Sequence, residues 1–177
     1  MLLVVAGSAL AGGLAMLALT GLVRLAGGSH REAAPSHVYS PPGHAFSIGV
    51  PRGWTALSDD RLARVPGSPA AVLRRSDGRG TVIIQRTGDL RGNPRQVARE
   101  LTARLSRRMP GFKLVSARVG RTRAGAAFLY TFVRPGAAQS LTVTNVHGVT
   151  YRIDTVVPAG APAAAREAGA TVGSFGP

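Results

Sequence analysis

Residues 115–156, VSARVGRTRAGAAFLYTFVRPGAAQSLTVTNVHGVTYRIDTV, decide the fold. Apolar and polar side chains alternate in four short segments of this stretch, a pattern typical of β-strands. Pro135-Gly136 and His147-Gly148 separate segments as turn-forming pairs, so we expect the strands to run antiparallel. The segment 126–133 carries apolar side chains on both faces, which predicts a central strand covered on each side.

Two helices are predicted beside these strands. Asn93-Pro94 is a strong start signal, with Asn as the N-cap and Pro at the first helical position. Apolar residues then recur every four positions, and Pro110-Gly111 ends the pattern. These apolar residues are Val97, Leu101, Leu105 and Met109. A second, Ala-rich helix is expected over residues 163–171.

Three further strands are predicted upstream of the first helix. Residues 46–50 alternate as a strand that Pro51 ends, and residues 71–75 and 81–85 form a hairpin through Asp77-Gly78. Residues 55–69 are expected to be a loop with one helical turn, capped by Asp59-Asp60. The sequence therefore predicts an α+β fold: an antiparallel sheet of about six to seven strands flanked by two main helices.

This order of elements resembles the Mog1/PsbP-like α/β/α sandwich family. The likeness is carried by FSIGVPRGW (46–54), the aromatic strand 126–132, VTYRIDT (149–155) and Ser174-Phe175, and it covers about residues 44–176. The resemblance implies a binding function and, for a bacterial member of the actinobacterial type, an extracytoplasmic domain tethered to the membrane. It supplies no catalytic residues to transfer to this chain.

The N-terminal segment Met1–Val23 contains no charged side chain and matches the roughly 20 residues that cross a bilayer as a helix. We expect an uncleaved, single-pass membrane anchor, because a basic start and an Ala-x-Ala cleavage site are both missing. Residues 24–43 are expected to form a flexible Gly/Ser/Pro linker, and residues 44–177 the folded domain. Arg24 and Arg31 favour a cytoplasmic domain by the positive-inside tendency, whereas the resemblance favours an extracytoplasmic one.

Composition excludes several classes of function. The 177 residues include 22 Lys and Arg against eight Asp and Glu, a formal net charge of +14, and no Cys. Disulfides, zinc–thiolate sites and thiol nucleophiles are therefore excluded. The arginines are spread along the chain without interleaved aromatic motifs, so nucleic-acid binding is not expected. Attraction to anionic lipid or cell-wall polymer fits a basic, membrane-anchored domain better.

No sequence motif indicates catalysis, a metal or a cofactor. A Gly-x-Ser-x-Gly nucleophile elbow is missing, and Gly78-Arg79-Gly80 precedes no helix that could bind phosphate. His30, His37 and His44 are spaced seven apart, but they fall in the Pro-rich segment and are expected to be solvated. His147 is explained by a turn that tolerates positive φ.

The sequence predicts a membrane-anchored, non-catalytic domain of the cell envelope that recognises a protein partner. Two alternatives are an arginine-mediated binder of anionic lipid or wall polymer, and a hydrolase with a cryptic site. Trp54, the only Trp, is either a binding platform or, as we favour, a buried core residue. The candidate ligand or partner surface comprises Trp54, Arg74, Arg75, Arg86, Arg95 and Arg99.

Overall fold

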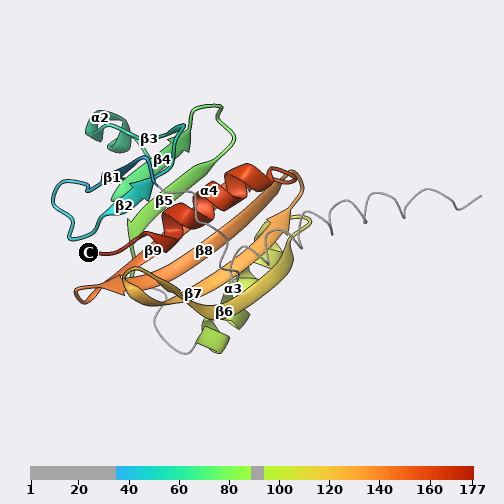
Figure 1. The fold of residues 1–177 in the computed structure, drawn as a ribbon. Coiled ribbons are helices and arrows are strands. Elements are labelled where there is room, and N and C mark those ends of the chain that lie inside the picture. The colour runs from blue at the N-terminus through green and yellow to red at the C-terminus, as the bar shows by residue number, and fades with distance from the viewer. Residues whose placement is uncertain (1–34, 89–93) are drawn as a thin grey trace, which may run out of the picture.

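Seven antiparallel strands form the main sheet in the computed structural model, which describes residues 35–88 and 94–177. Their order is β3-β4-β5-β9-β8-β7-β6 (Figure 1). The strands are β3 (Trp54–Ala56), β4 (Ala71–Arg75), β5 (Thr81–Arg86), β6 (Lys113–Thr122), β7 (Gly125–Arg134), β8 (Ala137–Val146) and β9 (Val149–Pro158). A separate two-stranded sheet pairs β1 (His37–Tyr39) with β2 (Ile48–Val50).

Helices lie on the two faces of the main sheet (Figure 1). Helix α3 (Pro94–Arg108) buries Val97 and Leu101 in a cluster with side chains of β7 and β8. Helix α4 (Pro162–Gly173) packs Ala164 and Ala168 into the larger core on the opposite face. The short α2 (Asp59–Leu62) lies between β3 and β4 in the chain. This arrangement confirms the expected α+β sandwich with two main helices.

The last residues of the chain close the core beside β2. Phe175 is 0% exposed, and its ring centroid lies 4.7 Å from that of Phe46 and 5.4 Å from that of Tyr151. Ser47 and Gly176 form a β-bridge that joins this C-terminal segment to the residue before β2. The C-terminus is thus bound to the start of the domain by aromatic packing and backbone hydrogen bonds.

The four long strands β6–β9 follow one another as hairpins, as the sequence predicts. His147 and Gly148 have φ values of 48° and 81° at the turn between β8 and β9. Two consecutive positive φ values match the twist of a tight two-residue hairpin. The interpretation of His147 as a turn residue is therefore confirmed.

Several expectations differ from the structure or lie outside it. Positions 55 and 56 of the expected loop belong to strand β3, because their backbone pairs with β4. Part of the expected linker, His37–Tyr39, is strand β1, because its backbone pairs with β2. The N-cap of α2 is Ser58; Asp59 and Asp60 occupy the first turn, where their charges favour the helix dipole. The predicted cap Asn93 and the predicted anchor Met1–Val23 lie outside the described residues. Within the described ranges, no helix is long and apolar enough to cross a membrane.

The cover of β7 is also less complete than expected. This strand is second from the edge of the sheet, with β6 beyond it. Tyr130 and Phe132 are buried on the α3 side, but Leu129 on the other side is only half-buried. The apolar residues on both faces of β7 therefore do not mean that other elements cover both faces of this strand completely.

Replacing Phe175 by Ala tests whether the C-terminal aromatic packing holds the domain together. We expect the free energy of unfolding to fall by about 3–5 kcal/mol, because the substitution leaves a cavity between Phe46 and Tyr151. Urea unfolding followed by Trp54 fluorescence measures it. Val119→Ala is the control, since Val119 is 62% exposed and its loss costs about 0.5 kcal/mol or less. Equal effects of the two substitutions would contradict the assignment.

Candidate functional site

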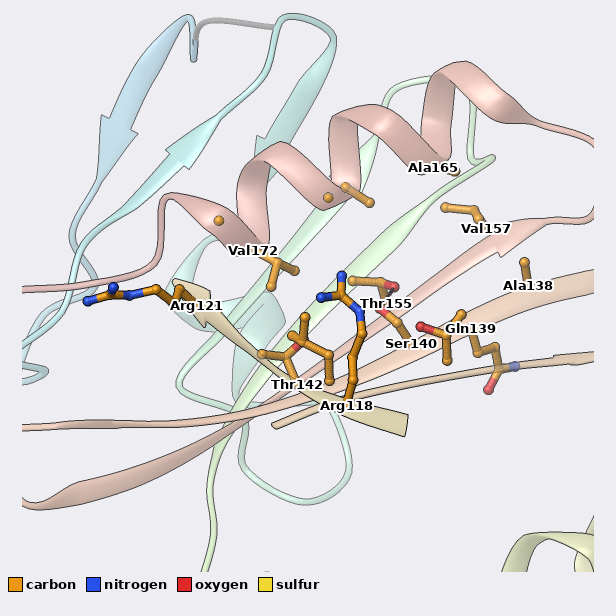
Figure 2. A pocket seen from close by; sticks show the side chains of 15 residues that line it. Arg118, Arg121, Ala138, Gln139, Ser140, Thr142, Thr155, Val157, Ala165 and Val172 are labelled. Atoms are coloured by element: carbon orange, nitrogen blue, oxygen red, sulfur yellow. Dashed lines mark hydrogen bonds between the residues drawn. The ribbon is translucent and has the colours of Figure 1, made fainter. Parts of the chain in front are cut away.

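A groove of about 240 Å³ lies between α4 and the sheet (Figure 2). Its wall on the helix side is made of small side chains, so the helix backbone lies close to the hollow. Its floor crosses three strands, and two arginines come from the edge strand. The helix contributes Ala165, Ala168, Gly169 and Val172, the floor includes Leu129, Thr131, Ser140, Thr142, Thr155 and Val157, and β6 contributes Arg118 and Arg121.

The groove combines aliphatic and hydroxyl groups with the two arginines. Ser140 and Thr155 share a hydrogen bond of 2.6 Å between their hydroxyl groups. In Figure 2 the Arg118 side chain extends toward α4, and Arg121 lies near the C-terminal end of that helix. Among the described residues that line this groove, none is an acid or a histidine. Such a lining can form apolar contacts and bind an anionic group, but it offers no carboxylate or imidazole base for proton transfer.

Gly120 shapes the open side of the groove. A Cβ atom at this position would lie 2.4 Å from Cδ1 of Leu129 on the neighbouring strand. The Leu129 side chain therefore extends over Gly120 toward the edge of the sheet. A glycine inside a strand often marks such a close approach, and here it leaves an apolar surface beside the edge strand.

A second hollow, of about 660 Å³, lies on the α3 side of the same edge. It is lined by apolar side chains of β6 and β7, among them Val119 and Phe128, and by Arg95 and Arg99 of α3. Residues 118 and 119 are adjacent on β6, and side chains of adjacent strand residues point to opposite faces. Strand β6 thus has one hollow on each face of the sheet.

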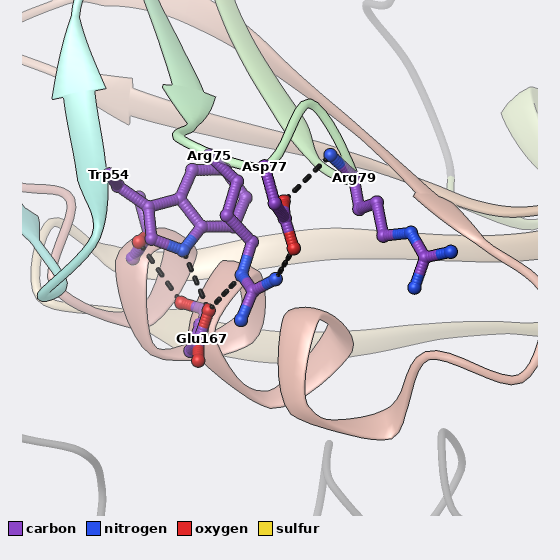
Figure 3. Close-up of polar contacts among 6 residues, drawn as sticks. Trp54, Arg75, Asp77, Arg79 and Glu167 are labelled. Carbon is purple, nitrogen blue, oxygen red and sulfur yellow. Dashed lines mark hydrogen bonds and ion pairs between the residues drawn. The ribbon is translucent and has the colours of Figure 1, made fainter.

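Trp54 and Arg75 converge on one carboxylate of α4 (Figure 3). The Trp54 Nε1–H and the Arg75 Nε–H each donate to Oε2 of Glu167 at 2.8 Å. Arg75 also forms an ion pair with Asp77, which in turn accepts a hydrogen bond from the backbone N–H of Arg79 at 2.8 Å. The cluster connects β3 and β4 with α4 and stabilises the position of that helix.

Partial burial alone would raise the pKa of Glu167, but the hydrogen bonds from Arg75 and Trp54 outweigh it and lower the pKa. The hydrogen bond with Glu167 correspondingly raises the pKa of Arg75. Trp54 is 2% exposed, which confirms its interpretation as a core residue. A buried indole whose N–H is already bonded presents no open platform to a ligand.

The structure distributes the other candidate arginines over different surfaces. Arg74 and Arg75 are adjacent on β4, so their side chains point to opposite faces of the sheet. Arg86 lies at the end of β5, close enough to His44 to lower the pKa of its imidazole in addition to the effect of burial. Arg95 and Arg99 line the hollow between α3 and β6. The six candidates therefore form no single patch.

Burial also perturbs the pKa of a carboxyl group on the sheet. Burial raises the pKa of Asp154 on β9, and its ion pair with Arg152 at 2.8 Å offsets part of the rise. Within residues 35–88 and 94–177, no three His, Asp or Glu side chains are grouped as metal ligands would be. Asp154 is paired with Arg152 on the same strand.

Sequence reasoning missed Glu167, Arg118 and the groove itself. Glu167 has no sequence signal, since its role depends on a tryptophan 113 positions away. Gly120 was the sequence signal that could have indicated the groove. An isolated glycine inside a strand with alternating side chains often marks a place where another group approaches the backbone closely.

Comparison with known proteins gives similarity at the level of structure. No family model matches the chain, and no curated protein matches it. The solution structure of the cyanobacterial PsbP protein, CyanoP, from Synechocystis sp. PCC 6803 is similar over 84% of this chain and 95% of that protein, with a TM-score of 0.53 and 18% identity. The chain has the PsbP-like fold.

A second protein with this PsbP-like fold comes from Mycobacterium tuberculosis. The crystal structure of LpqN, described as involved in cell envelope biogenesis, is similar over 80% of this chain and 93% of LpqN. The TM-score is 0.50 and the identity 16%. These similarities confirm the fold predicted from the sequence, and at such low identity they establish the fold alone.

Glu167→Gln tests the cluster between β4 and α4. Because folding lowers the pKa of Glu167, its contribution to stability is present above the pKa of the unfolded state and is lost as pH falls through the lower, folded value. We expect the variant to lose about 1–2 kcal/mol near neutral pH, and less in strong acid. Denaturant unfolding at several pH values measures this. Glu100→Gln, at an exposed position of α3, is the control; a loss in Glu167→Gln that is independent of pH would refute the assignment.

Proposed function

We propose that this chain is a non-catalytic domain of the cell envelope that binds a protein partner through the groove between α4 and the sheet. The observation that carries the proposal is the groove's size and lining. Its volume of about 240 Å³ is below the roughly 300–1,000 Å³ of pockets that enclose small ligands. A hollow of this size suits one or two side chains of a partner.

The residues that line the groove favour a binding function over a hydrolase active site. A hydrolase needs a nucleophile with an adjacent base, and the groove's Ser140 hydroxyl instead shares its hydrogen bond with Thr155. Arg118, whose side chain extends toward α4 (Figure 2), can attract an acidic group without any proton transfer.

The envelope location is supported by two independent observations. LpqN, which shares the fold, is described as involved in cell envelope biogenesis. The uncharged apolar segment Met1–Val23 has the composition and length of a membrane anchor. We therefore propose a single-pass anchor with the folded domain on the extracytoplasmic side.

Site-specific crosslinking tests the proposed function. A photoreactive residue at position 121, beside the groove, is compared in intact cells with one at the exposed position 64, which follows α2. We expect the same envelope protein to be captured repeatedly from position 121 and not from position 64. Capture of the same proteins from both positions, or of none, would reject the groove as the binding site.

A pair of Gly169 substitutions supplies the matched control for this experiment. A Cβ atom at Gly169 meets no other atom within 4 Å, so the helix accepts larger residues here. Gly169→Leu is expected to fill the groove mouth and to reduce capture at least tenfold, while Gly169→Ala retains it. Both variants should fold, since replacing a helical glycine stabilises a helix by about 0.5–1 kcal/mol.

The alternative of an anionic lipid or wall polymer as the ligand makes a different prediction. It requires basic side chains gathered on one surface, whereas Arg74 and Arg75 point to opposite faces. Binding to anionic vesicles that disappears with added salt, together with absent protein capture, would favour that alternative.

A further inference from the structure

Strand β6 is the last strand of the main sheet, and its one hydrogen-bonded neighbour among the described strands is β7. It is ten residues long, whereas the strand at the opposite edge, β3, has three. Edge strands present unpaired N–H and C=O groups that can pair with another extended chain. Natural proteins shorten or cover such edges, so a long one with no described strand beside it indicates a surface that is used.

The register of the sheet identifies which residues of β6 direct their backbone groups away from β7. The N–H of Thr87 donates to the carbonyl of Thr150 at 3.0 Å, so Thr150 directs its backbone groups toward β5. Along an antiparallel strand these groups point alternately to the two sides. The residue pairs between β9 and β8, between β8 and β7, and between β7 and β6 then fix the direction of the backbone groups on each strand. By this register the backbone groups of Arg118, which lies opposite Leu129, point toward β7. The residues that direct N–H and C=O to the free edge are Ala117, Val119 and Arg121.

Side chains along this edge offer apolar contacts on both faces of the sheet. Val119 is 62% exposed and lines the hollow on the α3 side. On the α4 side, Leu129 extends over Gly120 toward the edge. An added strand would place successive side chains alternately against these two apolar surfaces.

The charge of β6 decides which kind of chain can pair with it. The strand carries Lys113, Arg118 and Arg121 and no acidic residue. Pairing with β6 of a second copy would bring two basic strands side by side, which repulsion opposes. A strand with acidic side chains would instead gain opposite-charge pairs across the new ladder.

We propose that β6 accepts an extended segment of the partner as an eighth strand, and that this segment contains the pattern acidic–apolar–apolar–acidic. The acidic residues lie opposite Arg118 and Arg121, and the apolar residues opposite Val119 and Gly120. The pattern reads the same in both directions along the chain. This inference rests on the proposed protein-binding function and names the surface and the chemistry of the partner.

Two synthetic peptides of identical composition test the pattern. One contains Thr-Glu-Val-Val-Glu-Thr, and the other contains Thr-Val-Glu-Glu-Val-Thr, both with blocked termini. The full chain in detergent micelles is expected to bind the first at least about tenfold more tightly than the second. Backbone amide exchange followed by NMR should slow at positions 117, 119 and 121 when the first peptide is added.

Three variants separate strand addition from charge attraction. Val119→Pro removes an N–H that faces the free edge, so it should abolish peptide binding while the pairing of β6 with β7 persists. Val119→Thr, which retains the N–H and a β-branched side chain, should bind as the unchanged protein does. Arg121→Glu should weaken binding of the first peptide by about fivefold, because it replaces an opposite-charge pair by a like-charge pair. This variant still tests the inference if Val119→Pro fails to fold.

Several results would overturn the inference. If the two peptides bound equally well, the interaction would depend on net charge alone and not on the order of the residues. If neither peptide bound, the proposed strand pattern would be excluded. A dimer that Val119→Pro converts to monomer would assign the edge to a second copy of the chain. If peptide binding fails while position 121 still captures an envelope protein, the inference is wrong and the proposed function stands; if both fail, both are wrong.

Discussion

The position of α4 on the sheet is the constraint on which the rest of this structure depends. Small side chains, Ala164 and Ala168, let the helix approach the strands closely. Glu167 binds Trp54 and Arg75 through one carboxylate oxygen, and Phe175 just beyond the helix packs on Phe46 and Tyr151. These contacts hold the helix over the central and early strands of the sheet.

A helix held in this position leaves the β7 and β6 side of the same face without a complete cover. Leu129 remains half-buried as a result, and the groove opens beside it. The groove is therefore a consequence of how the core closes, because the side chains that fix α4 lie toward the opposite edge of the sheet. The position of α4 thus explains both where the core is tightly packed and where the groove remains open.

The basic character of the edge has a structural role as well as a proposed recognition role. A ten-residue edge strand with an exposed valine is a hazard for self-association. Three basic side chains and a register shift between Leu114 and Ser116 oppose pairing with an identical strand. The same charges favour an acidic partner strand, so protection and selectivity come from the same residues.

Local patterns in the sequence determined the elements of this protein. The recurrence of Val97 and Leu101 predicted α3, the His147-Gly148 pair predicted the tight turn, and the alternation in 115–156 predicted the four-strand meander. The resemblance of 46–54 to a PsbP-like entry strand then gave the correct fold. Each of these signals depends on neighbours within about one helical turn or one hairpin, which a sequence displays directly.

Contacts between distant residues were decided by the tertiary structure alone. The pairing of Trp54 with Glu167, the separation of Arg74 from Arg75 onto opposite faces, and the position of β6 at the edge all depend on strand order and on the docking of α4. Strand order in an antiparallel sheet is a global property, because burial of the whole core selects it. For that reason the candidate arginines inferred from sequence were dispersed, and the groove was found only once the sheet and helix were in place.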